Sequence, residues 1–245
     1  MSFTSWRGTV GVIKPTYRPG SLEEFIRLLP DGIAVIPLFL GIRRGTIQEF
    51  RDTLTAVEQK VGELVEIGVD LIHPEGAPPF MLLGYAGERE LVERWQRDYR
   101  RPVITSGMSQ AEAMRALGMR RIVGVTYFKG ELNDVFAQYF VDAGFDVLAM
   151  EGLEVEFEMV GRLSSREVYA HTKAAVLRQE RVDGVYMLGS GWRVLDIVEL
   201  LEQDLELPVV HPVPARVWAV QQRFRVRQRA KGFGRLLAEL PAVAR

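Results

Sequence analysis

Two short segments decide how this chain folds: Ile72-His73-Pro74-Glu75-Gly76-Ala77 and Met187-Leu188-Gly189-Ser190-Gly191. Each follows an apolar run and ends in small residues, as a buried strand does where it passes into a loop or helix. Each also stands at the corresponding point of a series of apolar runs that occurs twice in the chain. The sequence therefore predicts two similar halves, each with a buried strand that ends in small residues.

Near-continuous apolar runs recur along the chain, each bounded by glycine, proline or charged residues. Those of strand length cover residues 9–15, 33–40, 69–75, 102–106, 121–128, 146–150, 184–188 and 208–213. Uninterrupted apolar strands of this length are typical of a parallel sheet buried on both faces.

The segments between these runs have helical spacing of their apolar residues. We expect helices over residues 46–67, 109–117, 132–143 and 195–205. Gly118 and Gly144 follow the second and third of them, where glycine commonly ends a helix. Alternating strands and helices with short connections predict an α/β architecture with doubly wound parallel sheets.

The order of the runs repeats, with Gly11-Val12-Ile13-Lys14-Pro15 matching Val123-Gly124-Val125-Thr126-Tyr127. We expect a duplicated unit of roughly 110 residues, about the size of a small domain. Two Rossmann-like lobes related by pseudo-two-fold symmetry would then face each other, with the site in the cleft between them. We place the first lobe at residues 1–118 together with about 214–245, and the second at residues 119–213.

The composition limits the function. The formal net charge of −1 gives no reason to expect nucleic acid or a membrane as partner. With no cysteine, the chain has no thiol nucleophile and no Cys-ligated metal, and with only three histidines a His-rich zinc site is not expected. No glycine-rich dinucleotide or triphosphate motif follows the first strand, so a nicotinamide cofactor or a nucleoside triphosphate is not expected. Without a signal peptide or a long apolar segment, the chain is predicted to be cytoplasmic.

Ligands of parallel α/β sheets bind outside the carboxyl ends of the strands, so a small set of residues should meet in the cleft. Those expected to act in catalysis are Glu75, Ser190 and Tyr127. Those expected to bind the substrate are Lys14, Thr16, Gly76, Ala77, Thr126, Gly189 and His211.

Glu75 is the sharpest candidate, because a carboxyl group at the end of a buried strand can serve as a general acid or base once its pKa is shifted. The alternative is a helix N-cap that only satisfies backbone donors. Gly76-Ala77 and Gly189-Ser190-Gly191 either present backbone N–H groups to a carboxylate or enediolate, or are tight turns that need small residues.

Three further positions keep two interpretations each. Lys14 attracts an anionic substrate, or it is a surface lysine whose charged end reaches water. One residue of register decides whether Tyr127 or Phe128 faces the cleft. His211 is an acid, a base or a carboxylate donor, or it is a buried histidine bonded to the backbone.

Several motifs stand in an order and spacing that resemble a known family. They are Gly11-Val12-Ile13-Lys14-Pro15, Ala116-Leu117-Gly118-Met119-Arg120-Arg121-Ile122, Thr126-Tyr127, Asn133, Val182-Asp183-Gly184-Val185, and Pro208-Val209-Val210 with Ala215. On these motifs, and over roughly residues 8–220, the chain resembles the aspartate/glutamate racemase superfamily, on the branch that holds arylmalonate decarboxylase and maleate cis-trans isomerase.

The resemblance implies a cofactor-free and metal-free enzyme that binds a small carboxylate between the lobes and forms a carbanion-like or covalent intermediate. The two thiol positions of the family fall on Glu75 and Gly189, so a two-thiol mechanism is excluded here. We expect a lyase or isomerase in which Glu75 moves the proton during decarboxylation, tautomerisation or hydration. A catalytically silent carboxylate-binding member and a structural subunit are the alternatives, and a homo-oligomer is left open.

Overall fold

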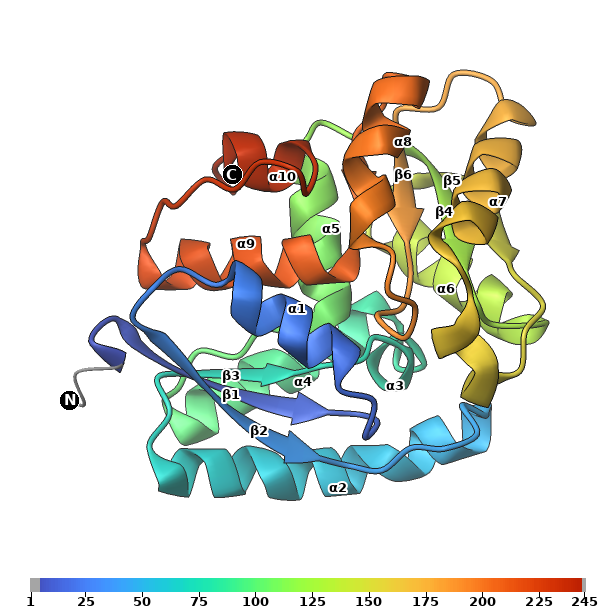
Figure 1. Ribbon diagram of the computed structural model, residues 1–245. Helices are drawn as coiled ribbons and strands as arrows, with labels where there is room; N and C mark the ends of the chain where they lie inside the picture. Colours follow the sequence, from blue (N-terminus) through green and yellow to red (C-terminus); the bar gives the residue numbers. More distant parts are fainter. Residues whose placement is uncertain (1–4, 244–245) are drawn as a thin grey trace.

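The computed structural model describes residues 5–243, and these residues form two parallel β-sheets (Figure 1). The first sheet has the order β2-β1-β3, built from β1 (Gly8–Lys14), β2 (Ile33–Phe39) and β3 (Leu71–Pro74). The second has the order β5-β4-β6-β7, built from β4 (Arg121–Thr126), β5 (Asp146–Gly152), β6 (Gly184–Met187) and β7 (Val209–Val210). All of these strand pairs are parallel, which confirms the predicted α/β class. In each sheet the first strand lies between the second and the third, as a repeated unit requires.

Helices connect the strands and cover the sheets. In the described part of the chain they are α1 (Gly20–Leu28), α2 (Ile47–Ile67), α3 (Pro78–Met81), α4 (Gly84–Tyr99), α5 (Ser106–Ala116), α6 (Glu131–Asp142), α7 (Ser165–Leu177), α8 (Val198–Leu205), α9 (Pro212–Phe224) and α10 (Arg235–Glu239), with 3-10 turns η2 (Phe157–Arg162) and η3 (Leu195–Ile197). In Figure 1, α2 runs along one side of the first sheet and α1 lies on the other.

Local sequence explains where α2 begins and ends. The Thr46 hydroxyl accepts the backbone N–H of Glu49 at 3.2 Å, and Gly68 ends the helix in the left-handed conformation at φ 84°. The helix expected from residue 109 instead begins at Ser106. The Ser109 hydroxyl does not cap it, because it donates to the carbonyl of Thr105 at 2.6 Å from inside the helix.

The prediction of a strand over residues 102–106 is wrong. This segment forms only an isolated bridge between Val103 and Ile72 at the edge of the first sheet. The Pro102 carbonyl and the Ile104 N–H both bond to Ile72 at 3.0 Å, but Pro102 and Pro74 have no N–H with which to extend the ladder on either side. α5 then begins at Ser106, so no ladder can extend.

The core of both lobes lies between the strands and their helices. Val10 and Val12 of β1 and Val123 and Val125 of β4 have no exposed surface. Helix α9, close to the C-terminus, packs against α1 and α5 of the N-terminal half of the chain. The exact division into lobes, which includes residues 1–4 and 244–245 outside the described residues, stays a prediction.

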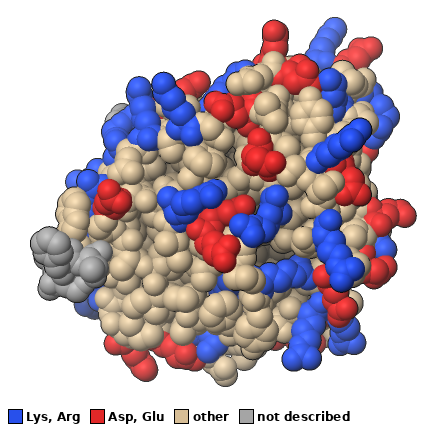
Figure 2. Space-filling model, in the orientation of Figure 1, with Lys and Arg blue, Asp and Glu red and all other residues tan. Residues whose placement is uncertain are grey.

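The surface carries charges of both signs. Figure 2 shows lysine and arginine side chains interspersed with aspartate and glutamate over the face in view. Between residues 5 and 243, none of the helices combines the length and the hydrophobicity that a membrane span requires.

Candidate active site

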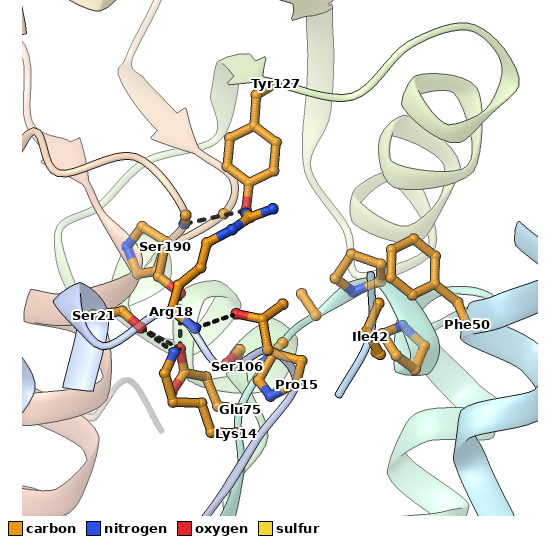
Figure 3. Close-up of a pocket in the computed structure, with 18 of the residues that line it drawn as sticks. Lys14, Pro15, Arg18, Ser21, Ile42, Phe50, Glu75, Ser106, Tyr127 and Ser190 are labelled. Carbon is orange, nitrogen blue, oxygen red and sulfur yellow. Dashed lines mark hydrogen bonds and ion pairs between the residues drawn. The ribbon is translucent and has the colours of Figure 1, made fainter. Parts of the chain in front are cut away.

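Residues that follow β1, β3, β4 and β6 line a cavity of about 50 Å³ (Figure 3). Most of the residues expected from the sequence are among them: Lys14, Thr16, Glu75, Gly76, Ala77, Tyr127, Gly189 and Ser190. The cavity has two unlike ends. Lys14, Ser21 and Glu75 lie together at one end in Figure 3, and Ile42 and Phe50 lie on the opposite wall.

Strand pairing places the first two charged groups side by side. β1 and β3 are neighbours, with Ile13 paired to Pro74. The backbone N–H of Glu75 donates to the carbonyl of Ile13 at 2.8 Å. Lys14 and Glu75 are the next residues along their strands, and the structure therefore brings their side chains to the same end of the sheet.

Glu75 is the centre of a buried polar network. Its Oε2 forms an ion pair with Nη1 of Arg216 at 2.8 Å, and its Oε1 lies 3.6 Å from Nζ of Lys14. The hydroxyls of Ser21 and Ser190 both donate to Oε1, at 2.8 and 2.9 Å. Burial by itself would raise the pKa of the Glu75 carboxyl. The charges of Arg216 and Lys14 and the Ser21 hydroxyl outweigh burial and hold the pKa well below its usual range.

These contacts change the role expected of Glu75. A general acid or base works best with a pKa near the working pH and with a free lone pair or proton. The Glu75 carboxylate stays ionised, with two hydroxyls donating to Oε1 and the Arg216 guanidinium 2.8 Å from Oε2. Helix capping does not explain Glu75 either, because the residue that precedes α3 is Ala77. Its contacts fit a fixed carboxylate that positions the hydroxyls of Ser21 and Ser190.

Lys14 is not a surface lysine. Its side chain is 2% exposed, and Nζ donates to Oγ of Ser21 at 2.7 Å. Burial lowers the pKa of Lys14; the Glu75 carboxylate opposes this shift, and the nearby Arg216 guanidinium adds to it. The net direction is downward, toward the neutral amine.

Both aromatic candidates line the cavity. The Tyr127 hydroxyl accepts the N–H of Gly191 at 3.2 Å, which leaves its own proton free to be donated. Burial raises the pKa of Tyr127 to about 12, so the phenol stays protonated at neutral pH. Phe128 contributes an apolar wall and stacks edge-on against Phe50 and Phe136.

The two glycine turns differ in what they offer. Gly189 has φ 98°, and a Cβ atom there would lie 2.3 Å from Cε1 of Tyr127. The position therefore has no room for any side chain, a thiol included. Gly76 has φ 97°, and its N–H donates to Oγ of Ser106 at 3.2 Å rather than into the cavity.

Thr126 and His211 do not line the cavity, contrary to expectation. The Thr126 hydroxyl donates to the Asn133 side chain at 2.7 Å and accepts the N–H of Phe128, which turns it into the loop after β4. His211 is fully buried, and its Nδ1 accepts the N–H of Val213 at 3.2 Å at the start of α9. Burial and the Arg216 charge lower the pKa of His211 to about 3, so it stays neutral.

Sequence reasoning missed Arg216, Ser21 and Arg18. Arg216 is fully buried in α9, and it is the only charged residue in the apolar stretch 212–220. A lone arginine in such a stretch is a recognisable signal of a buried partner. The Arg18 guanidinium, which lines the cavity, lies 4.5 Å from the ring centroid of Phe157 and donates to the Phe157 carbonyl. Its polar loop carries no comparable signal.

A family model described as arylmalonate decarboxylase matches residues 10–237. Over 233 residues, the chain is 23% identical to arylmalonate decarboxylase of Bordetella bronchiseptica, an alignment that covers 94% of this chain and 97% of that protein. The family match confirms the resemblance that the motifs indicated.

Solved structures have the same fold. Nocardia farcinica maleate cis-trans isomerase bound to TRIS has a TM-score of 0.88 at 18% identity, covering 95% of this chain and 98% of that one. The maleate isomerase Iso of Pseudomonas putida S16 has a TM-score of 0.87 at 22% identity, covering 95% of this chain and 99% of that one.

Proposed function

This chain belongs to the arylmalonate decarboxylase family, and we propose that it is a cofactor-independent lyase that removes CO2 from a small carboxylic acid with an apolar substituent. The observation that carries the proposal is the two-ended cavity. Its polar end has more positive than negative charge, because Lys14 and Arg18 line it together with the single carboxylate of Glu75. An anionic group is attracted to that end.

The opposite wall suits the rest of such a molecule. Ile42, Phe50 and Phe128 give it an apolar surface. A ligand site of this kind uses a few polar groups for orientation and apolar contacts for the remainder. An acid with a carboxylate at one end and an apolar group at the other therefore satisfies both ends of the cavity.

The state of Glu75 favours decarboxylation over the other reactions of this type. Tautomerisation and racemisation need a base to remove a proton from carbon. Glu75 is a weak base here, because two cations and two hydroxyls stabilise its carboxylate. Loss of CO2 needs no base; it needs a held substrate, stabilisation of the charge left on the product, and a later proton.

We assign these tasks to the residues at the polar end. Arg18 holds a carboxylate of the substrate, since its guanidinium offers paired donors. Tyr127 donates its free hydroxyl proton to the oxygen that becomes negative as CO2 leaves. Glu75 fixes Ser190, and the proton that ends on carbon comes from this network.

The test is direct turnover. Purified protein would be incubated with phenylmalonate, malonate, maleate and short 3-oxo acids, with CO2 release and NMR of the product as readouts. In D2O we expect one deuterium on the carbon that lost CO2. If an acid binds but no tested acid releases CO2 or takes up deuterium, the proposal is contradicted.

One observation favours the alternative of a catalytically silent carboxylate-binding protein. Glu75 and Arg216 already neutralise each other at 2.8 Å, so part of the charged end is engaged without a substrate. A silent member would show a higher Tm with carboxylates and no turnover. A small carboxylate as partner is thus common to both functions, and a homo-oligomer and a cytoplasmic location stay predictions.

A further inference from the structure

Lys14 differs from every other lysine of the described chain. It alone among them is buried, and it lines the cavity. Lys60, Lys129 and Lys173 form ion pairs nearer the surface, with side chains 27–45% exposed. A buried lysine is readily deprotonated, which is why enzymes use such lysines as nucleophiles.

The distances show that Lys14 is not the main counter-ion of Glu75. Arg216 approaches Glu75 to 2.8 Å, within contact distance for a charged pair, and Lys14 stays at 3.6 Å. The hydrogen bond that Lys14 Nζ does make is to the neutral hydroxyl of Ser21, at 2.7 Å. Lys14 therefore shares its only carboxylate, Glu75, with the closer Arg216.

The other two cations near the cavity cannot lose their charge. Arginine stays protonated throughout the range in which proteins fold. With Arg216 paired to Glu75 and Arg18 facing a bound carboxylate, the positive charge of Lys14 is the one that is not balanced. The low-energy way to remove it is release of the proton, which leaves a free amine at the polar end.

We propose that Nζ of Lys14 adds to the ketone carbonyl of a 3-oxo acid in the cavity and forms an imine, through which CO2 is lost. This inference rests on the proposed function, because it needs a carboxylic acid held at the polar end. It names the substrate class as 3-oxo acids with an apolar substituent. The chain has no thiol that could form a covalent intermediate instead.

The chemistry balances without a further reagent. The free amine forms a C–N bond to the ketone carbon, its two hydrogens pass to the oxygen, and that oxygen leaves as water. The imine nitrogen takes a proton from solvent. The bond to the carboxylate then breaks, CO2 departs, and its electron pair moves to the nitrogen as an enamine forms. A second proton adds to carbon, and water hydrolyses the imine to release the ketone, Lys14 and the first proton.

The neighbours of Lys14 suit these proton transfers. Ser21 lies between Lys14 and Glu75, with its hydroxyl 2.7 Å from the first and 2.8 Å from the second. Protons that move between the amine and the departing oxygen thus have a hydroxyl within reach. The permanent charges of Arg18 and Arg216 keep attracting the carboxylate after Lys14 has become neutral.

The experiment traps the imine. Wild-type protein would be incubated with acetoacetate and sodium cyanoborohydride, and the labelled residue located by mass spectrometry of peptides. We expect an isopropyl group on Lys14 if CO2 has left before reduction. Because burial lowers the pKa of Lys14 and the side chain lines the cavity, labelling of Lys14 should exceed that of the surface lysine Lys60. Lys60→Arg should keep the label, and Lys14→Met should lose it.

Two further arms separate the explanations. Malonate, which has no ketone, should raise the Tm and protect wild-type Lys14 from labelling, a result that does not depend on whether Lys14→Met folds. A Tm rise with malonate and no label on Lys14 would overturn the imine and leave the proposed function standing. No Tm rise and no label would overturn both. Equal labelling by acetone, which has no carboxylate, would overturn the assignment to 3-oxo acids.

Discussion

Replacing Arg216 by methionine is the sharpest test of the buried charge network. Its guanidinium is fully buried and lies 2.8 Å from Glu75, with Lys14 as the second cation at 3.6 Å. At an effective dielectric constant of about 20, these distances correspond to attractions of about 6 and about 5 kcal/mol. Removing one partner of a buried ion pair destabilises a protein by about 3–5 kcal/mol. Because Lys14 and two hydroxyls remain, we expect about 3 kcal/mol, or a fall in Tm of about 10 °C.

The pH dependence of this loss has a definite sign. In the wild type the folded pKa of Glu75 lies below its ordinary value of 4.5, so its stabilising contribution is present above that pH and is lost as the pH falls. Without Arg216 the pKa of Glu75 rises, and protonation relieves the unpaired carboxylate at low pH. The difference in free energy of unfolding between wild type and Arg216→Met should therefore be larger at pH 7.5 than at pH 4.

The assay is urea unfolding at both pH values, with Glu75→Gln and the double variant as controls. If the cost of Arg216→Met comes from an unpaired carboxylate, adding Glu75→Gln should recover most of it. A loss below about 1 kcal/mol at pH 7.5, or a double variant as unstable as the sum of the single ones, would refute the network as described.

Three other predictions concern single positions. Burial raises the pKa of the Glu88 carboxyl from 4.5 to about 7, so the wild type loses stability as the pH rises between those values. At pH 8, Glu88→Gln should therefore be more stable than the wild type by up to about 3 kcal/mol. Urea unfolding from pH 4 to 8 measures this, and a difference that does not vary with pH would contradict it. Tyr127→Phe should lower kcat/KM about 10²-fold and the stability by only about 1 kcal/mol, because the hydroxyl proton and one hydrogen bond from the Gly191 N–H are lost; unaltered kinetics would exclude the phenol from the reaction. Gly189→Ala should destabilise by about 1–3 kcal/mol, because its Cβ would lie 2.3 Å from the Tyr127 ring; near-native stability by thermal melting would show that the ring can move away.

Much of the fold could be predicted because it depends on neighbours along the chain. Apolar runs gave parallel strands, and Gly68 ended α2 where a left-handed residue was needed. The wrong strand at residues 102–106 depended on partners farther away. Its apolar side chains suit a sheet, but a longer ladder with β3 would need N–H groups at Pro102 and Pro74, which prolines lack.

The position of the candidate site could be predicted from the strand ends, but the arrangement of its charged groups could not. Lys14 and Glu75 could be placed together because β1 and β3 end at the same edge of one sheet. Thr126 and His211 lie away from the cavity, held by side-chain hydrogen bonds to residues near them in sequence, and no periodicity records such bonds.

By itself the sequence determined the family, the parallel sheets and the absence of a thiol from both strand ends. Only the tertiary structure decided what replaces the thiols. It brings Arg216, from a helix near the C-terminus, to within 2.8 Å of Glu75 and leaves Lys14 at 3.6 Å. The protonation state of a buried group is set by the charges around it in space, and those charges come from segments that lie far apart in the sequence.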